Sequence, residues 1–138
     1  MPFLDASDYQ MIRNAADALL DEKILPAADI DSPMYLNVAE EYVANRVAGA
    51  SLSASQTVHA KNAVASYCAA LMLPGITGKI AAAWGLKAPG AQPPNWRQRQ
   101  DALFQNAEHE IDAMNLQSES TTPGVSMTSA AAANVINF

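Results

Sequence analysis

The stretch SPMYLNVAEEYVANRVAG, residues 32–49, decides the fold class because it holds the start, the apolar face and the end of one helix. Ser32 followed by Pro33 favours helix initiation, since serine accepts hydrogen bonds from free amides and proline at the first helical position loses none. Apolar residues then recur at helical spacing: Leu36, Ala39, Val43 and Val47. Gly49 can end the helix in the left-handed conformation. The stretch therefore predicts a helix from residue 32 to about residue 48.

The residues before this helix predict a first helix and a connection. The first helix runs from residue 6 to about residue 20, with Asp5 as its N-cap and Asp8 near the positive end of its dipole. Its apolar stripe consists of Tyr9, Ile12, Ala16, Leu19 and Leu20. Residues 23–31 form a connection, because Pro26 disfavours continued helix.

The residues after Gly49 predict a third helix that stops at a proline. It runs from residue 54 to about residue 73, where Pro74 and Gly75 are expected to end it. The apolar residues along it are Val58, Val64, Tyr67, Cys68, Leu71 and Met72. Residues 76–94 predict an irregular segment, because glycine and proline recur there, with a short helix at residues 79–84.

A last helix is predicted from residue 96 to about residue 116, capped by Asn95 and packed on the second and third helices. Its long apolar stripe consists of Trp96, Leu103, Phe104, Ala107, Ile111 and Met114. After Leu116 the chain is rich in Ser, Thr and Ala and shows no periodicity. Two interpretations of this stretch stay open: a disordered tail, and an arm that orders on a partner through Val135, Ile136 and Phe138.

Composition favours helices throughout. Half of the 138 residues are hydrophobic but only 7% are aromatic, and alanine is abundant, a balance unlike that of sheets. We therefore expect an all-α protein: a small bundle of about four helices in residues 1–116 and an extended, flexible C-terminal arm in residues 117–138. The single cysteine, Cys68, excludes a disulfide framework within the chain and favours a reduced, intracellular setting. The apolar run 62–78 predicts a buried helix rather than a membrane span, because proline and glycine interrupt it.

Charge divides into three zones along the chain. Residues 1–41 hold nine acidic and two basic residues, a net charge of −7; residues 42–100 hold six basic and no acidic residues, +6; residues 101–138 hold five acidic and no basic residues, −5. Such zones fit either solvated faces that cluster by sign or surfaces that favour head-to-tail association. The overall charge of −6 argues against tight, general DNA binding, which needs many neutralised phosphates.

No motif in the chain predicts catalysis, a cofactor or a metal site. Residues 75–80 only loosely resemble a phosphate-binding loop, because the glycine spacing differs and no Ser or Thr follows Lys79. His59 and His109 are isolated, and the acidic neighbours of His109 occupy helical positions that point in different directions. Arg97 and Arg99 lie beside Trp96, but Trp96 belongs to the predicted core stripe, so sequence-specific DNA binding is not favoured.

Several motifs resemble those of the tailed-phage head-to-tail connector, or adaptor, family. The similar residues opening the second helix follow the Leu25-Pro26 turn and are Ile30, Ser32, Leu36, Ala39, Glu40 and Val43. Also similar are an alanine-rich third helix that ends in Leu-x-Leu-Pro at residues 71–74, and a last helix with Trp96 and Leu103 seven residues apart. Together these motifs cover most of residues 9–116, while residues 79–94 depart from the polar loop expected there.

The resemblance implies a structural virion protein without enzyme activity or cofactor. Such a protein is made in the host cytoplasm and forms a ring, usually of twelve subunits, in the virion neck between the portal protein and the tail. DNA passes through the ring without sequence-specific binding, no membrane is involved, and the arm reaches the portal. The zoned charges would then pair between subunits, with Glu40, Glu41 or the last helix against Arg46, Lys61, Arg97 or Arg99. Two alternatives stay open: another helical adaptor with a different partner, and a small enzyme whose site is assembled from distant residues.

Overall fold

The computed structural model describes residues 3–48, 50–86, 93 and 95–116, and within these residues the chain is helical and has no strand. The elements are the short 3-10 helix η1 (Ala6–Asp8) and the helices α1 (Tyr9–Ala16), α2 (Ala27–Ile30), α3 (Leu36–Val47), α4 (Ala54–Ala83) and α5 (Trp96–Ala113). The predicted all-α class is confirmed. The predicted arm, residues 117–138, lies outside the described residues.

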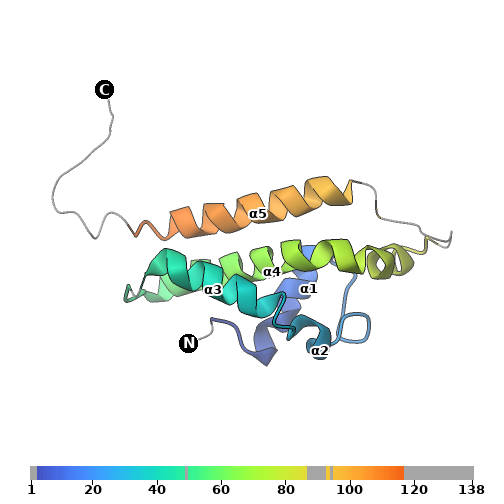
Figure 1. Cartoon of the computed structure of the whole chain (residues 1–138), viewed down its shortest axis with the longest axis horizontal. Coiled ribbons are helices and arrows are strands. Elements are labelled where there is room, and N and C mark those ends of the chain that lie inside the picture. The colour runs from blue at the N-terminus through green and yellow to red at the C-terminus, as the bar shows by residue number, and fades with distance from the viewer. Residues whose placement is uncertain (1–2, 49, 87–92, 94, 117–138) are drawn as a thin grey trace, which may run out of the picture.

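Helix α4 is the centre of the bundle (Figure 1). It begins at a capping box, in which Ser53 Oγ accepts from the Gln56 amide and the Gln56 side chain accepts from the Ser53 amide. Helix α5 runs back along α4, while α1 and α3 pack against α4 elsewhere on its surface. The largest fully buried side chains of α4 are Val64, Cys68, Met72, Leu73 and Ile80. By length and composition α4 could cross a membrane, but 67% of its apolar window is buried inside the bundle, as in a core helix.

The predicted end of the third helix at Pro74 is wrong, because α4 continues through Pro74 to Ala83. Proline has no amide hydrogen, so it leaves the carbonyl of Ala70, four residues earlier, without its helical donor. Gln100 of α5 supplies the missing donor: its Nε2 lies 2.8 Å from the Ala70 oxygen. The predicted short helix at residues 79–84 is the last part of α4.

The predicted first helix is shorter than expected. It begins as predicted, with Asp5 as the cap of η1 and Asp8 completing a capping box. It ends at Ala16 rather than near residue 20, because Asp17 adopts an extended backbone (φ −167°, ψ 137°). The Asp17 carboxylate accepts a hydrogen bond from the Leu19 amide at 2.8 Å, a local turn that competes with helix.

The second predicted helix begins later than expected. Ser32 Oγ accepts from the Met34 amide at 3.2 Å, so it caps a turn, and α3 starts at Leu36. At its end Ala48 takes the left-handed conformation, with φ 52°. Gly49 lies outside the described residues. The predicted connection 23–31 contains the short helix α2.

The last helix begins at Trp96 as predicted and ends at Ala113, three residues early. Asn95 precedes it with φ 61° and makes no side-chain capping bond, so the predicted cap is wrong. Asn115 also has a positive φ, 58°, and this left-handed residue stops any continuation of the helix.

The predicted apolar faces form one core. Leu36, Ala39, Val43 and Val47 of α3 are all buried, as are Ala107, Ile111 and Met114 near the end of α5. Two predicted core residues are instead exposed: Leu19 with 54% and Val58 with 56% of its surface. Leu19 faces out because the turn at Asp17 replaces the helical geometry that would have turned it inward.

Candidate functional site

The charge zones meet one another inside the folded chain. Every ion pair among the described residues joins the basic middle zone to one of the acidic flanking zones: Arg46–Glu108, His59–Glu110, Lys61–Asp8, Lys79–Asp29 and Arg99–Asp17. Three of the pairs join α4 to the segments packed around it, and the other two join α3 to α5 and the start of α5 to the end of α1. Intramolecular pairing therefore accounts for much of the zoning.

Asp17 is the most enclosed member of these pairs, with 6% of its side chain exposed. Its Oδ2 accepts from Trp84 Nε1 at 2.8 Å and from Arg99 Nη1 at 3.2 Å. Arg99 also donates through Nη2 to the carbonyl of Ala16. One carboxylate thus ties the end of α1 to the end of α4 and the start of α5.

Glu108 makes the corresponding connection nearer the other end of the bundle. It accepts from the Tyr42 hydroxyl and from Arg46 Nη1, the latter at 2.7 Å. The hydrogen bond from Tyr42, followed by that from Arg46, lowers the pKa of Glu108, and the same hydrogen bond raises the pKa of Tyr42. Helices α3 and α5 are joined here at the bundle surface.

Aromatic rings extend this connection across α4. Tyr42 stacks on Tyr67 with ring centroids 4.3 Å apart, and Phe104 meets Tyr67 edge-on at 5.2 Å. The three rings come from α3, α4 and α5, so each helix contributes one. Sequence reasoning placed Tyr67 and Phe104 on apolar stripes but had no signal that they would meet Tyr42.

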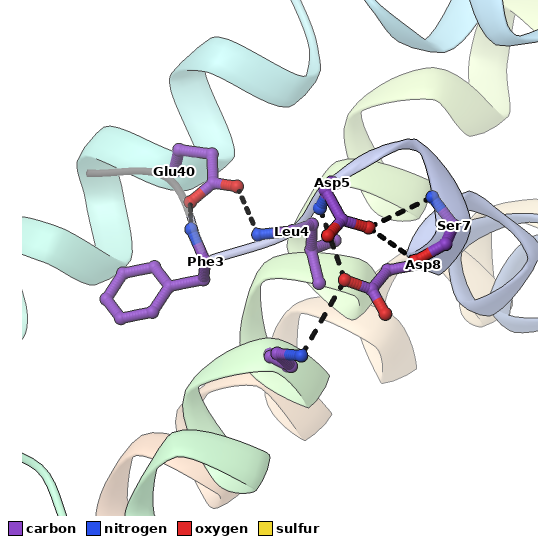
Figure 2. A network of polar contacts seen from close by, with 7 residues as sticks. Phe3, Leu4, Asp5, Ser7, Asp8 and Glu40 are labelled. Carbon is purple, nitrogen blue, oxygen red and sulfur yellow. Dashed lines mark hydrogen bonds and ion pairs between the residues drawn. The ribbon is translucent and has the colours of Figure 1, made fainter.

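Glu40, predicted to contact another subunit, fastens the N-terminal segment to α3. Its two carboxylate oxygens accept from the backbone amides of Phe3 at 2.7 Å and Leu4 at 2.9 Å (Figure 2). Nearby, Asp8 of the capping box lies 3.7 Å from the amine of Lys61 on α4. These contacts hold residues 3–8 against α3 and α4, and Leu4 is buried there.

Of the six charged residues predicted to pair between subunits, four therefore have a partner within the chain: Glu40, Arg46, Lys61 and Arg99. The other two remain on the surface. Glu41 is exposed on α3, and the guanidinium of exposed Arg97 lies over the ring of Trp96, 5.3 Å from its centroid. The predicted arm contacts Val135, Ile136 and Phe138 lie outside the described residues.

A hollow of about 280 Å³ lies beside the N-terminal segment, and its lining residues are Leu4, Tyr9, Asp31, Pro33, Leu36, Asn37 and Glu40. Three of its polar side chains are engaged: the Tyr9 hydroxyl donates to Asp31 at 2.6 Å, and Glu40 accepts from the amides described above. Burial, followed by the bond to Asp31, raises the pKa of Tyr9 to about 12.

The remaining reactive groups are placed for packing. Cys68 is fully buried, and burial raises the pKa of its thiol to about 12, so it stays protonated and unreactive at neutral pH. Within the ranges that the structure describes, no three His, Cys, Asp or Glu side chains are grouped so as to hold a metal ion.

Six large apolar side chains are exposed in the described part of the chain: Leu19, Met34, Val38, Val58, Trp84 and Leu86. Val38 and Glu41 are three residues apart on α3 and lie on one outward side of the helix, and Met34 is exposed in the turn that precedes α3; we call these three residues the outer stripe. Leu19, Trp84 and Leu86 lie where α1 and α4 end, and we call them the end patch. Sequence reasoning identified neither surface.

No family model, no curated protein and no solved structure matches this chain.

Proposed function

We propose that this protein is a structural assembly protein, a head-to-tail connector that forms a ring between a phage portal and tail. The observation that carries the proposal is the outer stripe on the segment with the connector-like motif. Met34 is 70% exposed and Val38 is 42% exposed, although α3 buries its other apolar face in the core. Large apolar side chains exposed on the turn before α3 and on the outward face of its first turn favour contact with another protein.

Charge suggests how such a contact would be oriented. Glu41 at the end of the outer stripe and Arg97 at the start of α5 are exposed charges of opposite sign on different helices. A contact between two different surfaces of identical subunits generates a ring when its rotation closes. We propose that Glu41 of one subunit faces Arg97 of the next.

The surface that remains after internal pairing suits a DNA channel. Four of the six basic residues in the middle zone, residues 42–100, pair within the chain. Among the described residues, the exposed acidic residues Glu22, Glu41, Asp101 and Asp112 form no ion pair, and the chain carries −6 overall. An acidic lining would repel phosphates and let DNA slide. The arm residues Val135, Ile136 and Phe138 would bind the portal, which places the protein in the virion neck.

The first test is the native mass by light scattering, with and without the candidate portal protein. The proposal expects a stoichiometric ring on the portal, and a chain that never binds the portal would reject it. The charge contact is tested separately by Glu41→Arg and Arg97→Glu. Each single variant should weaken the ring and the double variant should restore it, whereas equal assembly of all three would reject that contact.

Arg99 is unsuitable for such a reversal, because it holds Asp17 inside the subunit. Asp101→Arg provides a matched control, since Asp101 is exposed on the same helix. Another helical adaptor with a different partner is the second candidate, favoured by the same outer stripe, and co-purification from infected cells would separate the two. Two groups in the described part of the chain have a pKa raised to about 12, and neither favours the enzyme alternative: the Tyr9 hydroxyl is bonded to Asp31, and Cys68 is fully buried.

A further inference from the structure

The end patch consists of exposed apolar side chains on two segments that Asp17 ties together. The Asp17 carboxylate accepts from the backbone amide of Leu19 on one oxygen and from the Trp84 indole on the other, both at 2.8 Å, so the Leu19 backbone and the Trp84 ring lie close to each other. Leu86 is folded back over the last turn of α4, because its amide bonds to Ala81 at 2.9 Å and Gly85 takes φ 82°. Leu19 is 54% exposed, and Trp84 and Leu86 are each 41% exposed.

The chemistry of the end patch favours an apolar occupant. The only polar atom of the Trp84 side chain already donates to Asp17, so the exposed part of the ring has no hydrogen bond left to give. The other two side chains of the end patch, Leu19 and Leu86, have no polar atoms. These three exposed side chains belong to two segments joined through Asp17, whereas the apolar residues that are common on protein surfaces are exposed singly.

The chain itself contains a segment of matching character. Residues 135–138 read Val-Ile-Asn-Phe, and residues 117–134 connect them to Leu116 with a single charge, Glu119. A flexible linker of this length has a root-mean-square span of roughly 23 Å.

The distance that the linker would have to cross is of the same size. Arg99 contacts Asp17 beside the end patch, and from Arg99 to Ala113 helix α5 rises roughly 21 Å, at about 1.5 Å per residue. A linker whose relaxed span matches the distance gives the highest effective concentration, on the order of millimolar.

We propose that Val135, Ile136 and Phe138 occupy the end patch of their own chain while the protein is free. The arm folds back along the bundle, and its apolar tip is covered until a partner competes for it. The inference does not depend on the connector proposal, because it concerns the free protein alone. A portal, or any other partner of the arm, would have to displace the tip from Leu19, Trp84 and Leu86.

The test is paramagnetic broadening in the full chain. A nitroxide is attached to Asn134→Cys, next to the tip, in ¹⁵N-labelled protein; Cys68 needs no replacement, because its buried thiol with a pKa of about 12 does not react. We expect loss of the Trp84 indole and Leu19 amide peaks. In the variant that also carries Val135→Ser, Ile136→Ser and Phe138→Ser, those peaks should return, and broadening should centre on residues near Leu116. Equal spectra from the two proteins would overturn the proposal.

Two further measurements sharpen the result. Leu19→Ser with Leu86→Ser changes exposed side chains of the end patch, so it should free the tip while the far-ultraviolet circular dichroism stays unchanged. The second measurement mixes two proteins: one carries the nitroxide and no ¹⁵N, and the other carries ¹⁵N and no nitroxide. This mixture should show no broadening of the Trp84 indole peak. Broadening of full strength in that mixture would mean that the tip binds a second copy, and would overturn the same-chain proposal.

Discussion

Asp17 and Glu108 perform the same task in two different environments. Each carboxylate accepts from one arginine and one aromatic side chain, Arg99 and Trp84 in the first case, Arg46 and Tyr42 in the second. The side chain of Asp17 is 6% exposed and that of Glu108 is 42% exposed. Because water competes for exposed charges and not for buried ones, similar contacts should differ severalfold in their contribution to stability.

The largest effect is expected for Asp17→Ala. It leaves the Trp84 indole and the Leu19 amide without an acceptor and Arg99 without its counter-charge. The free energy of unfolding, measured by urea denaturation, should fall by about 3 kcal/mol. Asp101→Ala, which changes an exposed aspartate on α5, should cost little. Similar losses for the two variants would refute the role given to burial.

The second-largest loss of stability is expected from removing the uncharged hydrogen bond between Gln100 and the Ala70 carbonyl. Gln100→Leu leaves the buried Ala70 carbonyl without a donor, and the free energy of unfolding should fall by about 1–2 kcal/mol. In a Pro74→Ala background the restored backbone amide can donate to Ala70, so Gln100→Leu should then cost almost nothing. Additive effects in this double-mutant cycle would show that Gln100 does not compensate for Pro74.

The exposed carboxylate should give a smaller, pH-dependent effect. Glu108→Gln should lower the free energy of unfolding by about 0.5–1 kcal/mol at neutral pH, the range of surface pairs. The folded-state pKa of Glu108 lies below its ordinary value of 4.5, so this contribution is present above 4.5 and is lost as pH falls through the folded pKa. The stability difference between wild type and variant should therefore shrink in acid. A difference that grows in acid would contradict the lowered pKa.

The smallest expected effect is that of salt on the stability lost in each variant, and it should differ between Glu108 and Asp17. Raising the ionic strength from about 0.1 M to about 1 M shortens the screening length from about 10 Å to about 3 Å. The loss caused by Glu108→Gln should shrink by a few tenths of a kcal/mol. The loss caused by Asp17→Ala should stay constant within error, because solvent ions do not reach the Asp17 carboxylate. An equal salt dependence of the two stability losses would contradict the proposed difference between the exposed Glu108 and the buried Asp17.

Much of the fold was predictable from local pattern. The buried face of α3, the start of α4 at residue 54 and the start of α5 at Trp96 are where the sequence analysis expects them. The candidate site was less predictable. Glu40, Arg46, Lys61 and Arg99 were expected to pair between subunits, and each has a partner in the chain; a list of charges does not distinguish the two kinds of contact.

The apolar faces of the helices follow from local sequence alone, because a 3.6-residue period is visible in neighbouring residues. The ends of two helices depend on contacts that form only in the folded chain. Helix α4 passes Pro74 because Gln100, 30 residues beyond Ala70, donates to the carbonyl that proline leaves free. Helix α1 stops at Asp17, whose carboxylate forms a local turn with the Leu19 amide and is held by Trp84 and Arg99, 67 and 82 residues away. Local propensity is overruled where a distant side chain satisfies a backbone or charged group, and such partners come together only in the folded chain.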